Sequence, residues 1–192
     1  MYHQSARSLP RLGRVGLLLV LTATTLLGAA PARAQVGDTV NVVNLLIPGA
    51  YFLTSGSGRD ALQSTLYYRE AEFFRHGLGI GIAGVSGGVK VISAGSQLLP
   101  FSGSDQLLLI GPSVTVSTAR VAGWRPHASI GLFAGRVKSD QRGIDRWDFT
   151  PSLAVGVSYS FARLVTLTAE YRVTEEIGGI NTDGVALRLS LF

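Results

Sequence analysis

Two glycine-rich motifs are the stretches of this sequence whose residue types and spacing most resemble a chemical site. "GIGIAG" (79–84) spells the dinucleotide-binding pattern G-x-G-x-x-G, and "GVSGG" (84–88) spells the nucleophile elbow G-x-S-x-G. Both chemistries require a helix directly after the motif, to hold a pyrophosphate or to expose the serine. The residues that follow, "VKVI", are mainly β-branched. We therefore interpret the glycines as small positions within strands and Ser86 as a strand residue.

The two histidines beyond the N-terminal region offer no further site. His76 and His127 both lie beside predicted short turns, and Ser86 is expected half a strand or more from either. A catalytic triad requires its members to lie within hydrogen-bond distance. The sequence also contains no His, Asp and Glu residues with the spacing of a metal site. We therefore predict no catalytic residue, no metal ion and no cofactor.

The remaining chemical candidates are charged residues within runs that alternate between apolar and small polar residues. If these runs are neighbouring strands, their charges meet inside a barrel. Such charges serve either a gated ion path or a plug of paired side chains, and a narrow barrel favours the plug because side chains fill it. We predict a structural interior charge cluster of Glu70, Glu72, Glu170, Arg172 and Arg188.

The elements that must position these residues are strands, because residues alternate with a period of two after residue 35. "FTPSLAVGVSYSF" (149–161) places apolar residues on one face and Thr, Ser, Ala and Gly on the other, and "LVTLTAEYRV" (164–173) repeats the pattern. In the less regular run 62–75, we place Glu70 and Glu72 inside and Arg69 outside, because one charge facing lipid costs less than two. Pro112 lacks a backbone donor and is expected at a bulge. We predict strands at 39–54, 62–75, 78–92, 106–119, 126–138, 148–161, 164–174 and 184–192.

Short and long connections alternate along these strands. The tight ones are predicted at 75–77, 120–125 and 161–164, and the longer, polar ones at 55–61, 93–105, 139–147 and 175–183. Short periplasmic turns and longer outer loops are typical of outer-membrane barrels, whose strands need about 9 to 11 residues to cross the bilayer. One face carries Leu, Val, Ile and aromatic residues, and the other is small and polar. The predicted fold is therefore all-β: a closed, antiparallel, up-and-down, eight-stranded transmembrane β-barrel.

The first 34 residues have the three parts of an export signal. Three arginines precede an apolar run at 15–30, and "PARA" (31–34) supplies the small residues of a cleavage site. A retained membrane helix is the alternative, but the run is shorter than the roughly 20 residues that a spanning helix needs. We predict a signal peptide at 1–34, cleaved near Ala34, and a single barrel domain at 35–192.

Removing that segment lowers the formal net charge of the chain from +5 to +1. Four of the 17 basic residues and none of the 12 acidic residues lie in 1–34, so 13 basic residues remain against 12 acidic ones. This near balance predicts no nucleic-acid partner. The sequence has no cysteine, so an exported domain of this size does without disulfides.

The C-terminal hairpin carries a resemblance to a known family. "AEYRVTEEIGGINTDGVALRLSLF" (169–192) resembles the last hairpin of the outer-membrane β-barrel superfamily typified by the transmembrane domain of outer membrane protein A. The resemblance implies that the terminal aromatic, Phe192, is read by the barrel insertion machinery together with Leu187, Leu189 and Leu191. One departure is that Phe192 shares a face with Arg188 rather than with the leucines.

These observations predict a non-enzymatic, monomeric outer-membrane protein with a plugged interior and four outer loops for surface contact. Its expected partners are outer-membrane lipid, lipopolysaccharide and the insertion machinery. Two alternatives remain: a lipid A-modifying enzyme, which needs a catalytic histidine near the outer leaflet, and a soluble exported barrel with a small ligand, which needs charges on its outer face. The expected interfacial aromatic residues are Trp124, Trp147, Tyr159 and Tyr171.

Overall fold

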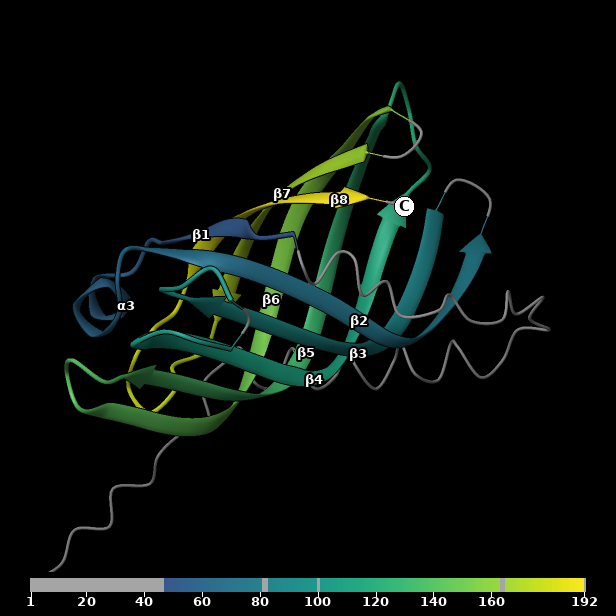
Figure 1. Cartoon of the computed structure of the whole chain (residues 1–192). Helices are drawn as coiled ribbons and strands as arrows, with labels where there is room; N and C mark the ends of the chain where they lie inside the picture. The colour runs from purple at the N-terminus through teal and green to yellow at the C-terminus, as the bar shows by residue number, and fades with distance from the viewer. Residues whose placement is uncertain (1–46, 81–82, 100, 163–164, 192) are drawn as a thin grey trace, which may run out of the picture. The chain divides into compact units, whose positions relative to one another are not determined.

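The computed structural model describes residues 47–80, 83–99, 101–162 and 165–191. Within these residues, eight strands form a closed barrel in which each strand pairs antiparallel with its neighbours in sequence and β8 pairs with β1 (Figure 1). This confirms the predicted all-β, up-and-down barrel. The predicted signal peptide at 1–34 and residues 39–46 of the first predicted strand lie outside the described residues. The strands are β1 (Gly49–Leu53), β2 (Thr65–Ile80), β3 (Ala83–Gly95), β4 (Asp105–Thr118), β5 (Trp124–Ser139), β6 (Ile144–Ala162), β7 (Val165–Thr174) and β8 (Gly184–Leu191).

The predicted alternation of short and long connections holds except between β5 and β6, where the four residues 140–143 form a shorter connection than the five residues 119–123 between β4 and β5. We call the end of the barrel that carries the connections 54–64, 96–104, 140–143 and 175–183 the loop end, and the opposite end, where β4 meets β5 through 119–123, the turn end. The first loop contains a short helix that was not predicted, α3 (Gly56–Ala61), whose N-cap hydroxyl on Ser55 accepts a hydrogen bond from the Gly58 amide. No helix in the described part of the chain is long and apolar enough to cross a membrane.

Three local predictions were wrong. Residues 75–77 are not a turn, because β2 continues to Ile80 past a bulge between Phe73 and His76, where Phe74 adopts a positive φ of 53°. Residues 139–147 are not an open loop, because β5 and β6 pair as far as Ser139 and Ile144. The register between β3 and β4 runs through Pro112 without a shift, so the expected bulge there is absent.

The alternation of the two faces follows the sequence pattern. On β6, Thr150, Ser152 and Ala154 are buried inside the barrel, while Phe149 and Leu153 are exposed on its outer surface. On β2, Glu70 is buried inside, where it contacts residues of β3 and β8. Arg69 lies on the opposite face of the strand, as predicted, but it is only 3% exposed there. The barrel therefore presents its apolar side chains outward.

The sequence pattern predicts a small, polar inner face along the whole barrel, but only part of the interior is polar. Toward the loop end it is filled by a hydrophobic cluster that we call the apolar core. Leu107 and Leu109 of β4 point into it, in a stretch where both faces of the strand are apolar. The buried members of the core are Tyr51, Leu53, Ala61, Leu62, Leu66, Tyr68, Ile92, Ala94, Leu107, Leu109, Phe133, Val137, Ile177 and Ala186.

One residue of the last loop belongs to the apolar core. Ile177 has no exposed surface and lies over Gly135, where a Cβ atom would come within 2.8 Å of the Ile177 Cδ1 atom. A glycine on β5 thus leaves the space that this loop side chain occupies. The 175–183 loop is therefore packed into the loop end of the barrel.

We expect Ile177→Ala to lower the free energy of unfolding by about 2–5 kcal/mol, because it empties a filled site in a closed core. The exposed neighbour Glu176 is the control, since Glu176→Ala is expected to change stability by less than about 0.5 kcal/mol. Denaturant titration followed by tryptophan fluorescence measures both. Equal losses for the two variants would contradict the packed position of Ile177.

Candidate functional site

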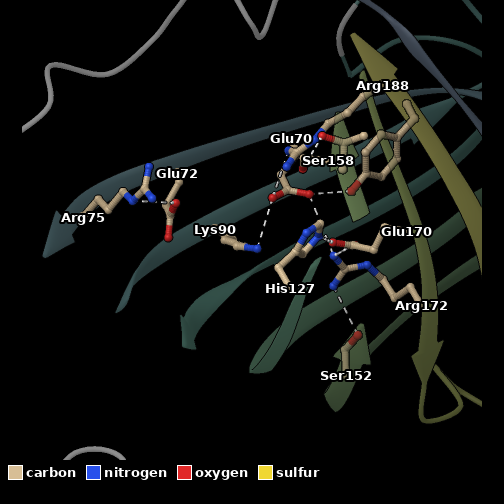
Figure 2. A network of polar contacts seen from close by, with 12 residues as sticks. Glu70, Glu72, Arg75, Lys90, His127, Ser152, Ser158, Glu170, Arg172 and Arg188 are labelled. Carbon is tan, nitrogen blue, oxygen red and sulfur yellow. Dashed lines mark hydrogen bonds and ion pairs between the residues drawn. The ribbon is translucent and has the colours of Figure 1, made fainter. Parts of the chain in front are cut away.

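The interior charge cluster consists of side chains from several strands that point toward one another (Figure 2). By strand register it lies between the apolar core and the turn end. Its first centre is Glu70 on β2. The Lys90 Nζ atom on β3 and the Arg188 Nη1 atom on β8 each lie 3.1 Å from Glu70 Oε1. Glu70 Oε2 accepts a hydrogen bond of 2.6 Å from the Tyr68 hydroxyl and lies 3.8 Å from Arg172 Nη2. The buried carboxylate therefore has partners at both oxygens, as a buried charge requires.

The second centre is Glu170 on β7. Arg172, two residues further along the same face, donates to Glu170 Oε1 through Nη2 and to the Ser152 hydroxyl through Nη1. His127 on β5 places Nε2 3.3 Å from Glu170 Oε2. Since Arg172 also approaches Glu70, it joins the two carboxylates into one network.

A glycine makes room for the histidine. A Cβ atom at Gly156, on the strand between His127 and Glu170, would lie 2.9 Å from the His127 Nε2 atom and 2.5 Å from the Ala169 carbonyl oxygen. Any larger residue would push the imidazole away from Glu170. The small residues of β6 are therefore part of what positions the cluster.

An aromatic pair joins the charge cluster to the apolar core. The rings of Tyr51 and Tyr68 stack with their centroids 5.6 Å apart. The Tyr68 hydroxyl points to Glu70, and the Tyr51 hydroxyl donates to the Thr182 carbonyl in the last loop at 2.7 Å. Both rings thus pack in the apolar core, while the Tyr68 hydroxyl binds the charge cluster and the Tyr51 hydroxyl binds the last loop.

The structure brings together four of the five predicted charges. Glu70, Glu170, Arg172 and Arg188 meet in the cluster, whereas Glu72 pairs with Arg75 at 3.6 Å, away from the others (Figure 2). Sequence reasoning missed Lys90 and His127. Lys90 had a usable signal, because it alternates with Val89 and Val91 and so had to face inward.

The cluster consists of oppositely charged side chains that neutralise one another. Three basic side chains, Lys90, Arg172 and Arg188, surround two carboxylates. In the described part of the chain, no group of three or more His, Asp and Glu side chains is placed to hold a metal ion.

We predicted that Ser86 lies half a strand or more from both histidines, and for His76 this was wrong. Because β2 continues past residue 77, Gly77 pairs with Ser86 and His76 pairs with Gly87. Adjacent residues of a strand point to opposite faces, so Ser86 faces inward with Lys90 and His76 faces outward. The two residues are close along the strands, but their side chains lie on opposite sides of the sheet. They therefore do not form a nucleophile–base pair.

Two aspartates tie the loops at the loop end. Asp105 is fully buried. Its carboxylate accepts hydrogen bonds from the backbone N–H of Gln63 at 2.9 Å and from the Ser139 hydroxyl at 2.7 Å. The Arg142 Nη1 atom lies 3.6 Å from the same carboxylate. Asp183 accepts from the Thr174 amide through its side chain. Its carbonyl accepts from the Thr54 amide, so the first and last loops are also connected.

The predicted aromatic and leucine positions lie on the outer surface. Trp124 and Tyr159 pack with ring centroids 4.5 Å apart near the turn end, and Trp147 lies near the loop end. Leu187 and Leu189 are exposed on β8, as is Tyr171 on β7. Leu191 is the last described residue, and Phe192 lies outside the described residues.

Together these features define a class: a closed eight-stranded β-barrel with apolar residues outside and a buried charge cluster inside. No family model and no curated protein matches the sequence. Among solved structures, the chain is similar to one titled "Crystal structure of Neisserial surface protein A (NspA)". The two share 16% sequence identity with a TM-score of 0.41, over 76% of this chain and 92% of that one.

The two glutamates of β2 provide a matched test of the cluster. We expect Glu70→Gln to lower the free energy of unfolding by about 3–5 kcal/mol, because it leaves the buried Lys90 and the partly buried Arg188 without a carboxylate. Glu72→Gln removes only a contact to a largely exposed Arg75 and is expected to cost less than about 1 kcal/mol. Equilibrium denaturation measures both, and a larger loss for Glu72→Gln would contradict the assignment.

Proposed function

We propose that this chain is a non-enzymatic integral outer-membrane β-barrel protein with a structural and surface-contact role. The observation that carries the proposal is the distribution of side chains: large apolar residues cover most of the outer surface, and a cluster of charged side chains is buried inside. A soluble barrel exposing so many large apolar side chains would associate through them. Lipid is the environment in which this arrangement is stable.

The dimensions of β6 agree with a bilayer. Its outward face runs from Trp147 to Tyr159 through Phe149, Leu153 and Val155, all exposed apart from a partly buried Tyr159. At about 3.3 Å per residue this is roughly 40 Å along the strand, or about 30 Å across a membrane at the usual tilt. Trp147 and Tyr159 would thus lie at opposite membrane interfaces, the position predicted for both.

The interior supports a plug rather than a pore. The apolar core fills the loop half, and the charge cluster below it consists of side chains that bind one another. An eight-stranded barrel is just wide enough to be filled by its own side chains. In this proposal, the loop end faces the cell exterior and the turn end faces the periplasm, which follows the rule of long outer loops.

The remaining partners follow from this orientation. Leu187, Leu189 and Leu191 on β8, followed by Phe192, would serve as the signal for the insertion machinery, as the family resemblance implies. Lipopolysaccharide and phospholipid would contact the outward residues. Because β8 pairs with β1 of the same chain, a monomer closes its own sheet.

Neither alternative gains support. A soluble ligand-binding barrel needs a charged outer face, and the outer face of this barrel is mainly apolar. A lipid A-modifying enzyme needs a histidine near the outer leaflet. His127 lies inside the barrel beside Glu170, and His76 lies on β2 toward the turn end.

Heat-modifiability of the protein from a washed outer-membrane fraction tests the proposal. A closed membrane barrel resists unfolding by detergent at room temperature, so the unboiled protein is expected to migrate at a different apparent mass from the boiled protein. A protein that instead appears in the periplasmic extract, with no shift on boiling, would overturn the assignment.

Replacing one cluster carboxylate separates a plug from a gate. We expect Glu170→Gln to lower the free energy of unfolding by about 3–5 kcal/mol, because Arg172 and His127 lose their carboxylate, while single-protein conductance in planar bilayers stays near the baseline. The side chains still fill the interior, so no continuous water path opens. A large conductance rise in this variant would show that the cluster gates a pore.

A further inference from the structure

The outward face of the β5–β6 hairpin changes from aromatic to basic toward the loop end. Phe149, 77% exposed, is paired with Ala134; the next outward pair is Trp147, 57% exposed, with Arg136. The pair after that is Asp145 with Lys138. Phe133 and Val137 point into the core, which places Arg136 and Lys138 on the outer surface. Successive layers are about 7 Å apart, so both cations lie within about 14 Å of Phe149.

Arg136 is held in a defined position at this surface. Its guanidinium lies 5.4 Å from the centre of the Trp147 ring, and its Nε and Nη2 atoms donate to the two carboxylate oxygens of Asp145 at 2.8 and 2.6 Å. A guanidinium has five donors, so three N–H groups remain for another acceptor. Lys138 is similarly oriented by Asp140 at 2.9 Å and keeps further donors.

The other end of the same two strands lacks this feature. Near the turn end, the outward side chains of β5 and β6 include no Lys or Arg; they are Trp124, Pro126, Val157, Tyr159 and Phe161. Arg125 and His127 alternate with these residues and therefore face inward. The aromatic residues thus occur at both ends, but outward cations accompany them on this hairpin only at the loop end.

We infer that Arg136 and Lys138, backed by Trp147 and Phe149, form a binding site for the phosphate groups of lipid A in the outer leaflet. The inference rests on the proposed outer-membrane function, which places this end in that leaflet. Phosphates there lie directly above the acyl chains, and the hairpin presents acyl-contacting rings directly below its cations. Planar guanidinium donors suit phosphate oxygens. The continuity of the basic residues with the lipid-facing surface favours a lipid over a protein partner.

The acidic partners set the size of the effect. Asp145 and Asp140 balance the two cations, so the site has no formal net charge and each cation contributes a partly screened contact. We expect the Arg136→Gln/Lys138→Gln double variant to raise the Kd for bisphosphorylated lipid A about fivefold to tenfold. The control is Arg120→Gln/Arg146→Gln, which removes the same formal charge. Arg120 lies in the β4–β5 turn, at the other end of the barrel. Arg146 lies on the hairpin, but it alternates with the outward residues Asp145 and Trp147 and so is on the opposite face from the proposed site.

The experiment titrates the purified mature barrel in detergent micelles with bisphosphorylated lipid A and counts bound lipid by native mass spectrometry. Dephosphorylated lipid A and phosphatidylglycerol are the comparison ligands. Heat-modifiability of each preparation, and of protein from outer-membrane fractions, is checked first. The expected result is that wild type and control prefer bisphosphorylated lipid A to both comparison ligands, and that only the Arg136/Lys138 variant loses the preference.

Three results overturn the inference. Equal affinity of all variants for bisphosphorylated lipid A would show that these cations do not bind it, while heat-modifiable protein in the outer membrane would leave the proposed function standing. A preference for phosphatidylglycerol would assign the site to phospholipid. A protein that is absent from the outer membrane and shows no heat shift would overturn the proposed function and the inference together.

Discussion

Closure of eight strands into one ring is the constraint on which the rest of this structure depends. A ring of this size pairs the backbone of β1 with that of β8 and leaves an interior about as wide as its own side chains. In the loop half and the middle of the barrel, inward side chains therefore pack against inward side chains of other strands. This constraint explains the two interior regions: an apolar core toward the loops, and a charge cluster whose ion-paired side chains come from β2, β3, β5, β7 and β8.

In the charge cluster, ion pairs and hydrogen bonds offset the free-energy cost of burying charged side chains. Burying one carboxylate alone is costly, and pairing repays that cost only when the remaining hydrogen-bonding groups are also satisfied. Glu70 meets this condition through two cations and the Tyr68 hydroxyl. Glu170 meets it through Arg172 and His127. Because these residues come from five strands, the network is complete only when the ring is closed, and it favours one register among the strands that it links.

The sequence predicted the fold well where one face was lipid-like and the other was small and polar. The runs at 149–161 and 164–173 show this alternation, and both strands were placed correctly. Prediction failed where that contrast disappears. "RHG" at 75–77 reads locally as a turn, yet cross-strand pairing with β3 carries β2 through it. In the run from Leu107 to Ile110 both faces are apolar, so the sequence did not reveal that the loop half of the interior is an apolar core.

By itself, the sequence determined the number and direction of the strands, most of the alternation of short and long connections, and the face on which most side chains lie. These properties depend on local periodicity, which a single chain segment carries. Only the tertiary structure decided which charges meet, that Glu72 stays outside the cluster, and that Ile177 leaves its loop to pack over Gly135. These outcomes depend on strand register and ring closure, where a shift of two residues keeps every side chain on its face but changes every cross-barrel partner.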